Sequence, residues 1–178
     1  HGHHPSVLRS HRWRTATNSA AYLLPHLRPG LDLLDVGCGP GTITADLATR
    51  VAPGPVVGID LAADVIAAAN DQYADVANLR FAVDDVYGLQ AADDTYDVVY
   101  AHQVLQHLSD PAAALREMRR VCRPGGVIAA RDGDYEAFTW FPADPALDNW
   151  LRVYRNVCWR NNADPDAGRK LLHWAHAA

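Results

Sequence analysis

The chain has 178 residues, of which 49% are hydrophobic, and a formal net charge of −5. This length suits one domain with a real core and is too short for two, and the acidic balance argues against a general nucleic-acid binder, because phosphate contacts need clustered Lys and Arg. The cysteines Cys38, Cys122 and Cys158 include no Cys-x-x-Cys pair, so we predict neither a disulfide framework nor a zinc site and expect a reducing, cytoplasmic compartment.

Short apolar runs alternate with helical patterns from residue 31 onward, which is typical of a parallel sheet whose strands are joined by helices. The predicted strands are 31–36, 56–60, 79–83, 96–100 and 127–131. The predicted helices are 42–50, 64–73, one that Asp110 caps and 123–126 ends, 146–161, and a last stretch around 171–174. No apolar run approaches the roughly 20 residues that would span a bilayer, so no membrane segment is expected.

One local cluster of positive charge stands near the end of the helix after Asp110. It consists of Arg116, Arg119, Arg120 and Arg123. Cations are favoured at a helix C-terminus by the helix dipole, so we interpret the cluster as a solvated surface. The histidines at positions 1, 3 and 4 have no acidic or Cys partner close by in the sequence, and we predict no metal site.

A glycine-rich turn stands between the first predicted strand and the first predicted helix. It reads Asp35-Val36-Gly37-Cys38-Gly39-Pro40-Gly41. Glycines let the backbone approach a ligand where a Cβ would collide, and the next helix points free N–H groups at the same place. The Gly-x-Gly-x-Gly spacing differs from the Gly-x-Gly-x-x-Gly of a dinucleotide-binding turn, and no Gly-Lys-Ser/Thr of a phosphate-binding loop follows. We therefore predict a cofactor site at this strand end.

Carboxylates stand at the ends of the next two predicted strands. Asp60 ends the second strand, at about the distance from the glycine turn at which an acidic residue meets a ribose in related folds. Asp84 and Asp85 end the third strand, where one of them could accept a hydrogen bond from an adenine amine. Simpler interpretations stay open for Asp35, as a carboxylate that matches a helix dipole, and for Asp84, as a solvated group.

These motifs, in this order, resemble the class I methyltransferases that use S-adenosylmethionine, in the branch of the UbiE/COQ5-like (methyltransferase type 11) enzymes. The resemblance covers 31–134 and runs through 33–41, 57–60, 81–89, 96–99, 104–108, 115–117 and 121–126. It implies an α/β fold, a Rossmann-like three-layer sandwich with a mainly parallel central sheet.

The sequence departs from the family in two places. Gln90 stands where the family usually has proline. The family also continues into two further strands that this sequence lacks, so we expect a fragment, a disordered remainder or a partner subunit that covers the sheet edge.

The resemblance implies binding of S-adenosylmethionine, with S-adenosylhomocysteine as the product. At the methionine end, Asp35 and the backbone of Gly37, Cys38 and Gly39 would contact the cofactor, and the backbone at Ala101, just past the fourth predicted strand, would lie beside its amino group.

At the adenosine end, Asp60 would hold the ribose hydroxyls and Leu61 would lie against the adenine. Asp85 would accept from the adenine amine, and the Val86 N–H would meet the ring.

Methyl transfer from a sulfonium needs positioning and exclusion of water more than it needs a base. His102 is the candidate catalytic base, because it follows the fourth predicted strand and has an ordinary imidazole. We expect His107 to pack or cap instead. The resemblance implies that the acceptor pocket is built from 11–22 and 132–159. Aromatic residues there indicate an apolar or aromatic small molecule, with the alternative that most of them are ordinary core or surface residues; they are Trp13, Tyr135, Trp140, Phe141, Trp150 and Trp159.

The predicted organisation is an N-terminal helical segment (1–30) over the site, a cofactor-binding core (31–134) and a helical acceptor-side region (135–178). We expect a small-molecule methyltransferase that binds no nucleic acid and spans no membrane, with a homo-oligomer left open. Two alternatives remain: a non-catalytic protein that binds S-adenosylmethionine or a partner, and a nicotinamide-dependent oxidoreductase. The Gly-x-Gly-x-Gly spacing counts against the second.

Overall fold

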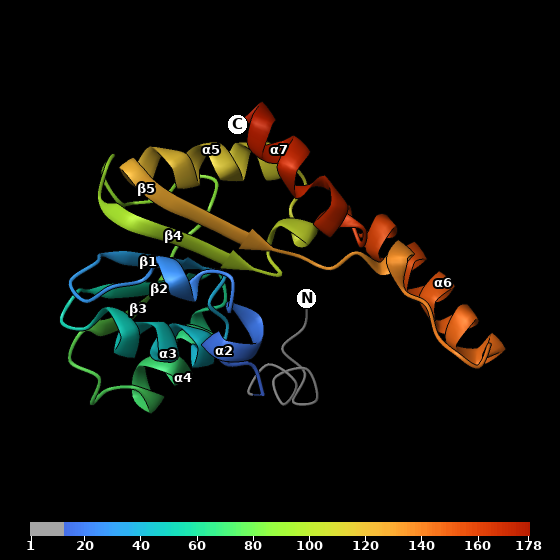
Figure 1. Cartoon of the computed structure of the whole chain (residues 1–178), viewed down its shortest axis with the longest axis horizontal. Coiled ribbons are helices and arrows are strands. Elements are labelled where there is room, and N and C mark those ends of the chain that lie inside the picture. The colour runs from blue at the N-terminus through green and yellow to red at the C-terminus, as the bar shows by residue number, and fades with distance from the viewer. Residues whose placement is uncertain (1–12) are drawn as a thin grey trace.

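The computed structural model describes residues 13–178, in which a five-stranded sheet lies between two layers of helices (Figure 1). The strands are β1 (Leu33–Val36), β2 (Val56–Asp60), β3 (Leu79–Val83), β4 (Tyr96–His102) and β5 (Cys122–Arg131). The helices are α2 (Ala16–Ser19), α3 (Thr42–Val51), α4 (Ala63–Gln72), α5 (Pro111–Val121), α6 (Pro145–Arg160) and α7 (Leu171–Ala177). Among the described residues, no helix is long and apolar enough to cross a membrane.

All five strands run parallel, in the order β3-β2-β1-β4-β5. In the centre, Leu34 of β1 lies between Val57 of β2 and Val99 of β4. The chain order reverses beside β1, and open α/β sheets bind ligands at the carboxyl ends of the strands at such a point. The predicted Rossmann-like fold is therefore confirmed, and it places the glycine turn at this reversal.

The hydrophobic core lies on both faces of the sheet, because the central strands are continuous apolar runs covered by helices on each side. Alternate residues face opposite layers: Leu34 and Val99 pack with Met118 of α5, whereas Leu33 packs with Leu47 of α3. A strand buried on both faces needs this unbroken apolar pattern, which is why periodicity predicted these strands well.

The starts of two helices follow the local chemistry of the sequence. Asp110 accepts a hydrogen bond from the Ala113 N–H at 2.9 Å and Pro111 opens α5, as predicted. Asp144 accepts from the Ala146 N–H at 2.8 Å, and Pro145 opens α6 in the same way. A carboxylate satisfies a free N–H there, and proline has none to satisfy.

Two strand boundaries differ from the prediction. β1 begins at Leu33, because the Asp32 N–H donates to the Asp97 side chain at 2.9 Å instead of joining the ladder. β4 runs to His102, since Ala101 and His102 pair with Ala130 and Arg131 of β5. Ala101 and His102 are thus strand residues, and the expectation that they follow the strand was wrong.

The start of β5 also differs from the prediction. The strand begins at Cys122, which pairs with Tyr96, and the register then shifts before Val98 meets Val127. The segment 123–126 therefore lies inside the strand instead of separating it from α5. Pro124 is tolerated because β5 is an edge of the described sheet.

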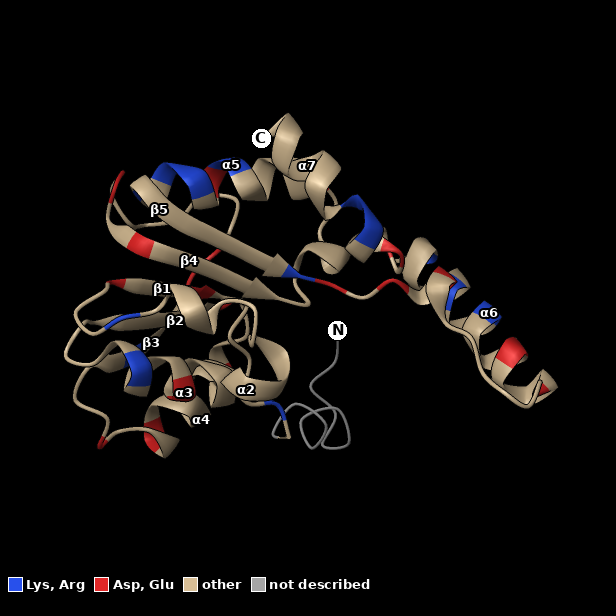
Figure 2. Ribbon diagram, in the orientation of Figure 1, with Lys and Arg blue, Asp and Glu red and all other residues tan. Residues whose placement is uncertain are grey.

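The interpretation of the arginine cluster on α5 as a solvated surface was wrong for two of its members. Figure 2 shows the positive charge along this helix. Arg120 forms ion pairs with Glu117 and Asp93, both at 2.8 Å. Arg123 pairs with Asp32 at 2.6 Å and Asp97 at 2.8 Å. These two arginines thus connect α5 and β5 to other elements.

Candidate functional site

A cavity of about 860 Å³ opens at the carboxyl ends of β1, β2 and β4. This volume is within the range of about 300–1,000 Å³ typical of ligand pockets. Nine of the predicted site residues line it: Asp35, Gly37, Cys38, Gly39, Asp60, Leu61, Asp85, Val86 and His102. Ala101 does not line it, because this residue is fully buried within β4.

The glycine turn has a backbone that other residues would strain. Gly37 has a φ of 67°, and a Cβ there would lie 2.4 Å from Cγ2 of Val104. Gly41 has a φ of 78° and caps α3, and its Cβ would lie 2.5 Å from Cζ of Phe81. Positive φ and absent space both require glycine. The turn is thus a fixed cradle beside the cavity.

Asp60 connects the end of β2 to the glycine turn. Its Oδ2 accepts from the Gly39 N–H at 3.1 Å, and its Oδ1 accepts from the Ala62 N–H at 3.0 Å. Each carboxylate oxygen retains a lone pair that a ribose hydroxyl could use. The sequence predicted the position of Asp60 at the end of β2. It did not predict the hydrogen bond to Gly39, because the two residues are 21 positions apart in the chain.

Asp35 is a buried carboxylate under the turn, with 2% of its surface exposed. Burial raises its pKa to about 7; the Thr44 hydroxyl, which donates at 2.7 Å, opposes this rise, and the charge of Asp60 adds to it. The simpler interpretation of Asp35 as a carboxylate at a helix end does not describe this environment, because the side chain is buried and bonded to Thr44.

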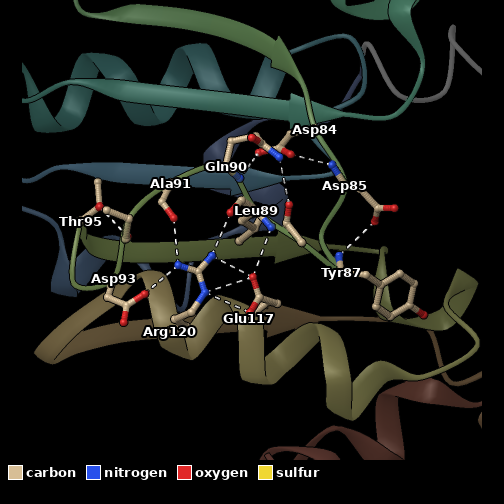
Figure 3. Close-up of polar contacts among 12 residues, drawn as sticks. Asp84, Asp85, Tyr87, Leu89, Gln90, Ala91, Asp93, Thr95, Glu117 and Arg120 are labelled. Atoms are coloured by element: carbon tan, nitrogen blue, oxygen red, sulfur yellow. Dashed lines mark hydrogen bonds and ion pairs between the residues drawn. The ribbon is translucent and has the colours of Figure 1, made fainter.

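The carboxylates after β3 shape the loop that carries them (Figure 3). Asp84 accepts from the N–H groups of Asp85 at 2.9 Å and Gln90 at 3.1 Å, and Asp85 accepts from the Tyr87 N–H at 3.0 Å. Asp84 is partly exposed, and its carboxylate closes this turn, so it is more than a solvated group. Proline, usual in the family at position 90, could not donate this bond.

Two residues of α5 hold the far side of the same loop (Figure 3). Arg120 donates to the carbonyls of Leu89 and Ala91, both at 2.9 Å, and Glu117 accepts from the Leu89 N–H at 3.2 Å. Sequence reasoning missed this arrangement, because Glu117 and Arg120 lie about 30 residues from their partners.

His102 lies at the edge of the cavity and is 8% exposed. Its ring stacks on Tyr100, with centroids 6.4 Å apart. Directly after β5, Asp132 accepts from the Gln106 N–H at 3.1 Å, and burial raises the pKa of Asp132 to about 6. His107 also lines the cavity, near the Gln106 amide at 3.2 Å. Neither histidine is buried beyond reach of a ligand.

The aromatic wall of the cavity is smaller than predicted. Of the six aromatic residues proposed from the sequence, only Tyr135 lines the cavity. Tyr154 of α6, which the sequence did not single out, packs against it with ring centroids 4.4 Å apart and lines the cavity too. Trp13 and Phe141 are 79% and 98% exposed. The histidines at 1, 3 and 4 lie outside the described residues.

Residues 34–130 match the family described as "Methyltransferase domain", and the chain belongs to this family. An uncharacterized methyltransferase of Schizosaccharomyces pombe is 33% identical over 177 residues, 95% of this chain and 63% of that protein. "Probable methyltransferase ltbC" of Aspergillus luteorubrus is 34% identical over 179 residues, 93% of this chain and 61% of that protein. The crystal structure of the [4+2]-cyclase SpnF has a TM-score of 0.59 at 28% identity, covering 70% of this chain and 47% of that one.

The chain thus spans less than two thirds of the length of these relatives. The predicted class, a class I methyltransferase that uses S-adenosylmethionine, is confirmed, and the UbiE/COQ5-like branch remains a prediction. The cavity fits this cofactor, because carboxylates for hydroxyl and amine groups stand beside a cradle that only glycine can form.

Proposed function

We propose that this protein transfers the methyl group of S-adenosylmethionine to a small-molecule acceptor. The observation that carries the proposal is that a single cavity is lined both by the glycine turn with Asp60 and by Tyr135 and Tyr154 from the region after β5. Cofactor and acceptor could therefore meet in one enclosure, as an in-line displacement requires.

At the cofactor, the predicted contacts form part of the proposal. Asp60 would hold the ribose hydroxyls and Asp85 the adenine amine, with Leu61 and Val86 against the ring. Asp35, Gly37, Cys38 and Gly39 would surround the methionine end. Ala101 could contribute only its backbone, because its side chain is buried in the core.

The cofactor supplies a methyl group on a positively charged sulfur, which needs little further activation. The protein would orient the acceptor and exclude water. His102 could hold a proton released from a hydroxyl acceptor, since its ring borders the cavity. We retain the division at residues 30 and 134 as part of this proposal, together with a cytoplasmic location, which the three buried free cysteines support.

The main alternative is a protein that binds the cofactor without transferring its methyl group. A solved structure of this fold is named a [4+2]-cyclase, so the fold and a cofactor site do not by themselves establish methyl transfer. Release of S-adenosylhomocysteine from S-adenosylmethionine in the presence of a metabolite pool separates the two functions.

The first test is calorimetric titration with S-adenosylhomocysteine, with NAD as the control ligand. We expect micromolar binding of the first ligand alone. Asp60→Asn keeps the size of the side chain but loses charge-assisted hydrogen bonds of about 1.5–3 kcal/mol, so binding should weaken roughly 10–100-fold. Asp75→Asn, at an exposed position outside the cavity, is the matched control and should bind as the wild type does. Equal binding by both variants would refute the role of Asp60.

A further inference from the structure

Arg14 is the one Lys or Arg side chain among the described residues that line the cavity. It is half-buried, and its Nη2 donates to Oε1 of Gln103 at 2.9 Å. Gln103 follows directly after β4, with a φ of 56° that is uncommon for a residue with a side chain. Its backbone N–H donates to the Arg131 carbonyl at 2.7 Å, which fixes the backbone that presents its amide to Arg14.

Arg14 has no carboxylate partner within ion-pair distance in the described chain, whereas Arg123 and Arg155 each have two. Residues 1–12 contain no Asp or Glu that could supply one. The groups that act electrostatically on Arg14 are the phenols of Tyr135 and Tyr100 and a second cation, Arg131.

The charge of Arg14 is poorly compensated as a result. Burial lowers its pKa, the two phenols oppose this, and the charge of Arg131 lowers it further. Tyr100 stays neutral, because burial raises the pKa of its phenol. Arg131 donates to the carbonyls of Asn18 and Ser19. A partly desolvated cation without an anion is costly, and an anionic ligand would remove that cost.

Arg14 stands away from the end of the cavity where Asp60 and Asp85 lie, so an anion bound to it would lie on the opposite side, near the region after β5. The carboxylates Asp60 and Asp85 stand at the ends of β2 and β3, whereas Arg14 acts beside Tyr135, which lies after β5. A single guanidinium in a cavity that also holds several carboxylates suits a singly charged anion better than a phosphate.

We propose that Arg14, oriented by Gln103, binds a carboxylate of the methyl acceptor, so that the acceptor is an organic acid. The inference rests on the proposed function and names the substrate class of that site. Four of the five N–H donors of a guanidinium remain when one is used by Gln103, enough for two parallel bonds to a carboxylate. The body of the acid would then lie against Tyr135 and Tyr154.

The test uses matched acid and amide pairs (benzoate and benzamide, cinnamate and cinnamamide, sorbate and its amide) on protein saturated with S-adenosylhomocysteine. Binding is followed by chemical-shift titration. In the wild type, at least one acid should bind roughly tenfold or more tightly than its amide, as a charge-assisted pair implies. Arg14→Gln should abolish this preference and Arg14→Lys should keep part of it. Arg152→Gln, an exposed α6 position that contacts Asn149, should change nothing.

A second titration identifies the source of the carboxylate, because the cofactor carries one itself. It compares S-adenosylhomocysteine with methylthioadenosine, which lacks the amino-acid end. If Arg14→Gln weakens only the first ligand, Arg14 binds the cofactor and the proposal is overturned. Absence of acid binding, equal binding of acids and amides, or preference for phenyl phosphate would also overturn it. Failure of the wild type to bind S-adenosylhomocysteine would instead count against the proposed function, and thermal unfolding of both Arg14 variants checks that they fold.

Discussion

At the scale of single residues, Asp35 combines a place in the wall of the cavity with an environment that disfavours its charge. Its carboxylate is buried, receives one hydroxyl hydrogen bond and lies near the negative charge of Asp60. Moving an ionised carboxylate from water into the protein interior is unfavourable, and one hydrogen bond offsets only part of this free energy. Binding a cation nearby, such as the amino group of a cofactor, would favour the ionised form.

We predict that Asp35 makes the protein less stable as the pH rises from about 4 to 7. Its pKa is raised from 3.8 to about 7, so between these values the unfolded state releases its proton while the folded state keeps it. Stability therefore falls over this interval and levels off once the folded carboxyl ionises. The full difference is on the order of 4 kcal/mol. Urea unfolding should show Asp35→Asn gaining stability relative to the wild type over this interval, whereas Asp75→Asn should not. Parallel curves for Asp35→Asn and wild type would contradict the assignment.

At the scale of elements, α5 determines the conformation of the loop that carries Asp84 and Asp85. Glu117 and Arg120 together satisfy backbone groups at Leu89 and Ala91 (Figure 3). Loops that lack their own ladder depend on such bonds for order. The position of Asp84 and Asp85 is therefore coupled to a helix that comes later in the chain.

We predict that Arg120→Gln loosens this loop. Amide exchange at Leu89 and Ala91 should accelerate roughly tenfold or more, because local opening requires fewer bonds to break. Exchange in β1 should stay unchanged, and S-adenosylhomocysteine should bind more weakly. Arg116→Gln on the same helix is the control, since its contact with Asp110 is long, at 3.9 Å, and exposed. Unchanged exchange at Leu89 would show that Arg120 does not order the loop.

At the scale of the whole molecule, the two helices after β5 differ in how much of their surface packs against the core. α7 packs against α5, whereas α6 projects from the body of the protein (Figure 1). Cys158 is the one buried residue of α6. Ion pairs hold this region together. Arg155 of α6 pairs with Asp166 at 2.7 Å, and Arg169 pairs with Asp134, just after β5, at 2.9 Å.

We predict that α6 opens more readily than α5 and that salt increases the difference. A helix with little buried apolar surface has a low free energy of local opening. The partly exposed ion pairs that Glu136 forms with Arg155 and Arg169 at the base of this region are screened by salt. Hydrogen exchange in 0.05 M and 1 M NaCl should show a larger acceleration in α6 than in α5. Equal protection of both helices would contradict this account.

The sequence by itself determined the existence of the five strands, the glycine turn and the helix start at Asp110, but not the bounds of β1, β4 and β5. These features depend on local causes: apolar periodicity, positive φ at Gly37 and Gly41, and a carboxylate before a proline. The position of Asp60 followed because every parallel strand ends at the same edge of the sheet.

The tertiary structure alone decided which side chains meet. Arg14 and Gln103 are separated by 89 residues, and Arg123 and Asp32 by 91. No local pattern predicts such pairs, because they arise only when packed elements bring distant segments together. For the same reason the surroundings of a charge became visible only in the fold. Examples are the burial of Asp35 and the absence, among residues 13–178, of a carboxylate paired with Arg14.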